Sequence, residues 1–151
     1  MADTPVVRRQ PEAARQQPAE GLQKSLSVLI VDDEVALQRL VERILTRRGH
    51  AVSCCGNTTE ARALLAQRTY DVLLSDIVMP GDDDGIGLAQ WTHERFPDMH
   101  IALMSGYSRD QTPAAIKFPY LQKPYRREAL LEIVERATSA AKPVAPQTRA
   151  G

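Results

Sequence analysis

The chain has 151 residues, of which 43% are hydrophobic and 25% charged, a balance typical of one soluble globular domain. Its 19 basic and 19 acidic side chains cancel to a formal net charge of zero, so charge gives no argument for binding nucleic acid or an acidic membrane. No apolar run approaches the ~20 residues of a membrane span, and no charged-then-apolar leader opens the chain. We therefore expect a cytoplasmic protein without nucleic-acid or membrane partners.

Two terminal stretches lack apolar periodicity. Residues 1–24 are rich in Pro, Gln, Ala and Arg, and residues 139–151 in Ala, Pro and Thr. Such compositions predict disordered tails, which leaves residues 25–138 as the folded domain. The neighbouring Cys54 and Cys55 would point to opposite faces of a strand, so we expect reduced packing residues and no disulfide between them.

The first predicted element is a strand at 26–31, where nearly every residue is apolar, as in a strand buried on both faces. A helix is predicted at 35–48, because apolar residues recur every three or four positions, and Gly49 stands where helices often end. The predicted inward stripe of this helix is Leu37, Leu40, Val41, Ile44 and Leu45.

A short strand is predicted next, at 51–55. Asn57 and Glu60 then have the spacing of a capping box, which predicts a helix from 57 to about 68.

The remaining elements continue the alternation of strands and helices. The patterns predict strands at 70–75, 100–104 and 120–122 and helices at 85–96 and 125–138. Alternating strands and helices indicate βαβ units, hence an α/β fold with a doubly wound parallel sheet and helices on both faces. Ligands of such sheets lie beyond the carboxyl ends of the strands.

Polar side chains stand at those strand ends. Asp32 and Asp33 follow the first strand, Asp76 the third, Ser105 the fourth and Lys123 the fifth. Clustered carboxylates repel one another, and a divalent cation removes that cost. Hard oxygen ligands in this number suit Mg²⁺. A lysine and a serine hydroxyl can bind phosphoryl oxygens, which makes Asp76, on the central strand, a candidate nucleophile towards phosphorus.

The whole set resembles the receiver domain of two-component response regulators over residues 25–138. The motifs that carry the resemblance are Asp32-Asp33, Asp76 with Met79-Pro80, Ser105-Gly106 and Lys123-Pro124. The resemblance implies five parallel strands in the flavodoxin-like order 2-1-3-4-5.

By this resemblance, Asp76 would accept a phosphoryl group from a histidine kinase or a histidine phosphotransfer protein. The cofactor would be Mg²⁺, bound directly by Asp33, through water by Asp32, and at Asp76 itself. The backbone carbonyl of Val78 would complete the protein ligands.

Three further roles are implied by the same resemblance. Ser105 would donate a hydrogen bond to a phosphoryl oxygen, and Lys123 would pair with the phosphoryl group. Tyr120 would be the aromatic switch residue, and the Lys123–Pro124 peptide would be cis.

The acidic run at Asp82, Asp83 and Asp84 has a simpler interpretation. Were it a calcium loop with Gly85 in sixth place, Pro80 and Trp91 would occupy the first and twelfth positions, and neither offers a carboxylate. We therefore predict a polar turn, with Asp84 as a candidate helix cap. Asp32 and Asp33 have an alternative role as caps of the first helix.

The segment between Ser105 and Lys123 is short for the family and contains Pro113 and Pro119. Because proline is tolerated only near a helix start and ends a helix beyond it, we predict a fourth helix that is short or distorted, within 113–117 at most. A second departure from the family is Arg126, which stands where many relatives have a Ser or Thr cap.

The function expected from the sequence is that of a single-domain response regulator, a phosphorylation-controlled switch that binds an unknown downstream protein, as a monomer or weak homodimer. We expect no enzyme activity beyond its own phosphorylation and dephosphorylation. One alternative is a receiver module cut from a hybrid histidine kinase. Another, a Mg²⁺-dependent phosphohydrolase, is disfavoured because Ile77 and Val78 follow Asp76 and provide no second acid. A constitutive binding module would have no need for the acidic cluster.

Overall fold

The computed structural model describes residues 25–79, 84–106 and 117–140. The predicted tail at 1–24 lies outside the described residues, and so do residues 141–151 of the predicted tail at 139–151, whose first two residues instead end the last helix. The predicted fourth helix also lies outside the described residues, apart from Lys117. The described strands are β2 (Ser27–Val31), β3 (Ala51–Cys55), β4 (Val72–Asp76), β5 (His100–Ser105) and β6 (Tyr120–Gln122). The described helices are α2 (Val35–Arg47), α3 (Thr58–Gln67), α4 (Gly85–Arg95) and α5 (Arg127–Ala140). None of these helices has the length and apolar character needed to cross a membrane.

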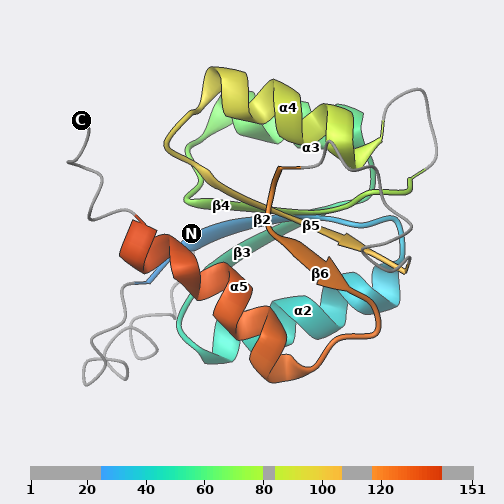
Figure 1. The fold of residues 1–151 in the computed structure, drawn as a ribbon, viewed down its shortest axis with the longest axis vertical. Helices are drawn as coiled ribbons and strands as arrows, with labels where there is room; N and C mark the ends of the chain where they lie inside the picture. The colour runs from blue at the N-terminus through green and yellow to red at the C-terminus, as the bar shows by residue number, and fades with distance from the viewer. Residues whose placement is uncertain (1–24, 80–83, 107–116, 141–151) are drawn as a thin grey trace, which may run out of the picture.

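The five strands form one parallel sheet in the order β3-β2-β4-β5-β6. In chain order this is 2-1-3-4-5, so the predicted fold class is confirmed. Helices α3 and α4 cover one face of the sheet, and α2 and α5 cover the other (Figure 1). Because the strands are buried on both sides, their side chains alternate between two separate cores. Ile30 and Leu74 belong to the core under α2 and α5, whereas Leu29 and Leu73 belong to the core under α3 and α4.

Two helices begin at side-chain caps made by nearby residues. The Asn57 side chain accepts the Glu60 N–H at 2.8 Å, and the Glu60 carboxylate accepts the N–H of Gly56 at 3.0 Å. In a capping box the Glu60 carboxylate would accept the N–H of the cap residue Asn57, so the bond forms one residue earlier in the chain than expected. Asp84 caps α4, since its Oδ1 accepts the Gly87 N–H at 2.9 Å, which confirms the prediction for this residue.

Several predicted boundaries and one inward residue were wrong. Strand β4 includes Asp76, where the predicted strand stopped one residue earlier, and α5 begins at Arg127 instead of residue 125. In α2, Val41 and Leu45 are buried, but Leu40 is 44% exposed. Leu40 lies at the margin of the apolar stripe, where a helix turns away from a sheet.

Candidate functional site

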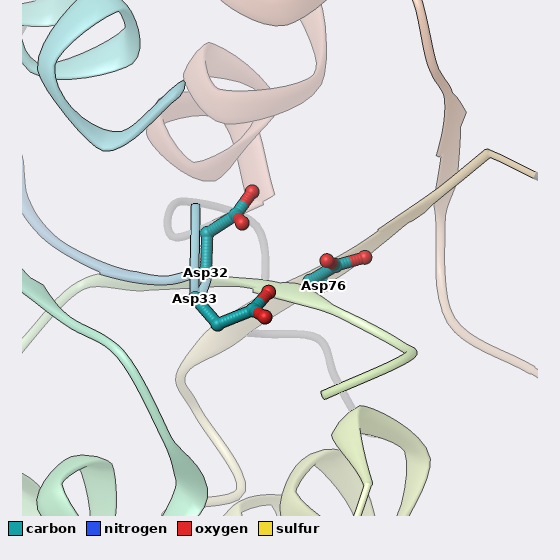
Figure 2. A group of neighbouring side chains, drawn as sticks. All are labelled: Asp32, Asp33 and Asp76. Atoms are coloured by element: carbon teal, nitrogen blue, oxygen red, sulfur yellow. The ribbon is translucent and has the colours of Figure 1, made fainter. Parts of the chain in front are cut away.

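Because neighbouring strands are parallel, the carboxyl ends of the central strands lie side by side at one end of the sheet, called the carboxyl edge below. Asp32 directly follows β2, and Asp76 is the last residue of β4. Together with Asp33 they can present carboxylate oxygens that lie within 4.8 Å of one another. Figure 2 shows the three carboxylates gathered beyond the strand ends. Asp32 is 1% exposed and Asp76 7%, whereas Asp33 is open to solvent.

Lys123, directly after β6, bridges the two buried carboxylates. Its Nζ donates to Asp32 Oδ2 at 3.1 Å and to Asp76 Oδ2 at 3.3 Å. Burial by itself lowers the pKa of Lys123, but the hydrogen bonds and negative charges of Asp32 and Asp76 outweigh it, so that the net shift is upward. The ammonium group is therefore held charged between the two acids.

The site has more negative than positive charge. Burial raises the pKa of Asp76, Asp32 and Asp33 raise it further, and the Lys123 charge opposes them without cancelling the shift. Among the described residues, three carboxylates thus gather around one ammonium group. Clustered hard oxygens with excess negative charge are the donor set that suits Mg²⁺, so these residues fit the cation expected from the sequence.

Asp32 is held by contacts that the sequence did not reveal. Gln38, on α2, donates through Nε2 to the backbone carbonyls of Asp32 and Cys55. The Asp32 carboxylate also accepts the N–H of Glu34 at 2.9 Å. The predicted capping role of Asp32 is therefore wrong, because the Glu34 N–H precedes α2, and Glu34, which stands at the N-cap position, makes no side-chain cap bond. Gln38 has no distinctive sequence signal, since glutamine is ordinary on a helix.

Two small residues fix the backbone of Asp76. The Ser75 hydroxyl donates to the Asp76 carbonyl at 2.9 Å, and the Gly85 N–H donates to the Ile77 carbonyl at 2.8 Å. A Cβ placed on Gly85 would lie 2.0 Å from the Asp76 carbonyl oxygen. Gly85 is thus required by close approach of two backbones, although the sequence suggested only a helix start there.

The other predicted site residues lie on the neighbouring strands. Ser105 ends β5 and is 1% exposed, and its carbonyl accepts the Lys123 N–H at 2.7 Å. Tyr120 opens β6 and is half-buried beside the core under α3 and α4. The Val78 side chain is 55% exposed. The Lys123–Pro124 peptide is cis, as predicted.

The two cysteines take no part in this site. Both are free, as expected. Burial raises the pKa of Cys54 to about 11 and that of Cys55 to about 12, so both thiols stay protonated at neutral pH, which is the form of an unreactive packing residue.

Comparison with known proteins matches this chain to one family. The family model "Response regulator receiver domain" matches residues 28–135. A putative NtrX-like response regulator of Rickettsia bellii is 30% identical over 122 residues, covering 78% of this chain and 26% of the relative. The DNA-binding transcriptional regulator NtrC of Salmonella typhimurium is 37% identical over 116 residues, covering 74% of this chain and 24% of the relative.

A solved structure agrees with these sequence matches. The response regulator protein TrrA of Thermotoga maritima, solved in complex with Mg²⁺-BeF, superposes with a TM-score of 0.67 at 27% identity, covering 74% of this chain and 97% of that one. The chain therefore belongs to the response regulator receiver domain family. It spans about a quarter of the length of the two curated relatives.

Proposed function

We propose that this receiver domain accepts a phosphoryl group on Asp76 in a Mg²⁺-dependent reaction and thereby switches its interactions with other proteins. The donor would be a phosphohistidine on a histidine kinase or a phosphotransfer protein. The observation that carries the proposal is the cluster of Asp32, Asp33 and Asp76 with the Lys123 ammonium group between its two buried members.

Each residue has a chemical task in this proposal. Asp76 is the nucleophile, and its raised pKa reflects a carboxylate whose charge its neighbours do not neutralise, so that a bound cation would stabilise it. Asp32, Asp33, Asp76 and the Val78 carbonyl would hold Mg²⁺, which supplies charge neutralisation at the phosphoryl oxygens.

Residues on β5, on β6 and directly after β6 would act on the phosphoryl group once it is attached. Lys123 would pair with its charge, and Ser105 would donate to one of its oxygens. Tyr120, on the neighbouring strand, would report the change to the surface as the switch residue.

The relatives support a receiver function for this chain, whereas phosphorylation, Mg²⁺ binding and the partners stay predictions. The TrrA structure is described as a complex with Mg²⁺-BeF, which makes that structure a precedent for an ion at a site of this family. The curated relatives are longer proteins, and NtrC is named as DNA-binding. The stand-alone organisation and the lack of a nucleic-acid partner expected from the sequence therefore stay predictions.

The phosphohydrolase alternative gains no support. Ile77 is buried and Val78 presents an exposed apolar side chain, so neither residue after Asp76 offers an acid to a leaving group.

The test is the intact mass of the protein after incubation with acetyl phosphate, with and without Mg²⁺. We expect one phosphoryl adduct on the wild type that requires Mg²⁺ and is absent from Asp76→Asn. Asp71→Asn is a matched control, because Asp71 lies just before the same strand, at its opposite end. An adduct that persists in Asp76→Asn would refute the assignment of the acceptor.

A further inference from the structure

Tyr125 has a buried hydroxyl with no use in the fold. Its oxygen is shielded from solvent and has no hydrogen-bond partner among the described residues. A buried polar group without a partner costs stability, because it has given up its bonds to water. The ring itself packs against the core under α2 and α5, and a phenylalanine would fill that space equally well. The hydroxyl therefore calls for an explanation.

The negative charges of the site act on this hydroxyl. Tyr125 follows Lys123 by two residues, across the cis peptide. Burial raises the pKa of Tyr125 to about 12, and the charges of Asp32, Asp76 and Glu34 contribute, with Asp32 the strongest of the three. The phenol is thus a neutral O–H group in the negative field of Asp32, and such a field favours donation towards the carboxylate.

Lys123 is shared between two acids in this structure. It donates to Asp32 at 3.1 Å and to Asp76 at 3.3 Å. A phosphoryl group attached to Asp76 would carry more negative charge than the free carboxylate, and would draw the ammonium group away from Asp32. Of the protein donors that contact its carboxylate among the described residues, Asp32 would then keep the Glu34 N–H, although it is 1% exposed.

We infer that the Tyr125 hydroxyl is a reserve hydrogen-bond donor for Asp32, which replaces Lys123 when that lysine turns to the phosphoryl group. Tyr125 is thus a positioning residue, since it acts by keeping the Asp32 carboxylate in place. In the unphosphorylated protein the hydroxyl has no partner among the described residues, and in the phosphorylated protein it donates to Asp32. Phosphorylation of Asp76 as the cause of this change rests on the proposed function. The replacement of Lys123 by Tyr125 at Asp32 can be tested without phosphorylation.

The test is a double-mutant cycle of Lys123→Met and Tyr125→Phe, measured by thermal unfolding at pH 7.5 in EDTA without a phosphoryl donor. In the wild-type background, Tyr125→Phe should raise Tm by about 3–6 °C, because it removes a buried hydroxyl without a partner. In the Lys123→Met background, the same substitution should lower Tm by a similar amount, because the hydroxyl has become a partner of Asp32. The reversal of sign supports the inference, and a shift of the same sign in both backgrounds overturns it.

Tyr70→Phe is the matched control. Its hydroxyl is also buried without a partner among the described residues, but Tyr70 precedes β4 and so lies at the opposite edge of the sheet from Asp76. Its effect on Tm should be the same with Lys123 and without it. If Lys123→Met does not fold in buffer, all proteins are measured at one concentration of trimethylamine N-oxide, which favours the folded state. Because no phosphoryl group is present in this cycle, a negative result would overturn the role of Tyr125 without affecting the proposed phosphorylation of Asp76. Likewise, a negative acetyl phosphate result would overturn the proposed function without affecting the result of the cycle.

Discussion

Two partly buried ionic clusters lie at opposite ends of the strands, one at their carboxyl ends (the carboxyl edge) and one at their amino ends (the amino edge), and they differ in charge balance. At the carboxyl edge, Lys123 serves both Asp32 and Asp76, with Asp33 close by. At the amino edge, Glu135 of α5 receives hydrogen bonds from Arg48 and His50.

The amino-edge cluster is complete. Arg48 donates from Nε at 3.0 Å and from Nη2 at 2.8 Å, one bond to each Glu135 oxygen. The Leu26 N–H donates to His50 Nδ1 at 3.1 Å, so we assign the ring hydrogen to Nε2, which lies 2.8 Å from Glu135. Among the contacts described here, the carboxylate thus meets the cation of Arg48 and the neutral donor of His50.

The difference separates a structural cluster from a reactive site. Burial tends to raise the pKa of Glu135, but the hydrogen bonds of Arg48 and His50 outweigh it and the pKa is lowered. At Asp76 the partners do not outweigh burial and the pKa is raised. A carboxylate whose charge is not neutralised by its protein neighbours is stabilised by binding a ligand, which is typical of a functional site. A carboxylate that is fully hydrogen-bonded within the protein instead stabilises the folded state.

The largest expected effect comes from breaking the amino-edge cluster. Glu135→Ala should cost about 2–3 kcal/mol of unfolding free energy, because Arg48 and the buried His50 both lose their acceptor. Denaturant unfolding measures it. Glu132→Ala is the control, since the Glu132–Arg136 pair is exposed and 4.0 Å apart, and should change stability by less than about 0.5 kcal/mol. Equal losses in the two variants would contradict the role of the cluster.

The next effect concerns the carboxyl edge. Gly85→Ala should cost about 1–3 kcal/mol, because the new methyl group meets the Asp76 backbone, even though alanine favours helices. The displaced Asp76 should also label more slowly with acetyl phosphate. Gly106→Ala, where a Cβ meets no atom of the described residues within 4 Å, should leave stability nearly unchanged. A Gly85→Ala variant as stable and as quickly labelled as the wild type would show that the close approach is not required.

The smallest expected effect is a pH dependence. The pKa of Glu135 is lower in the folded protein than in the unfolded chain, so its stabilisation is complete above the unfolded value of about 4.3 and is lost as pH falls through the folded value. Tm of the wild type and of Glu135→Gln, followed from pH 7 to pH 3, should therefore converge on acidification. A constant gap between the two curves would exclude this contribution.

The sequence by itself determined the fold class and the location of the site. Apolar runs and helical stripes predicted the described elements, because burial on two faces or on one stripe leaves a period in the sequence. The residues Asp32, Asp76 and Lys123 were expected together, since the ends of parallel strands share one edge. Local caps at Asn57 and Asp84 were also predictable, because their partners lie three residues away.

Only the tertiary structure decided which distant groups meet. Gln38 reaches Cys55, Arg48 and His50 reach Glu135, and Gly85 touches the Asp76 backbone. No period or motif marks these residues, because each contact depends on how a helix is placed over the sheet. The same holds for Tyr125, whose residue type suggests packing. Its buried hydroxyl becomes visible only once the chain around it has folded, because hydrogen-bond satisfaction is a property of three-dimensional neighbours and not of sequence neighbours.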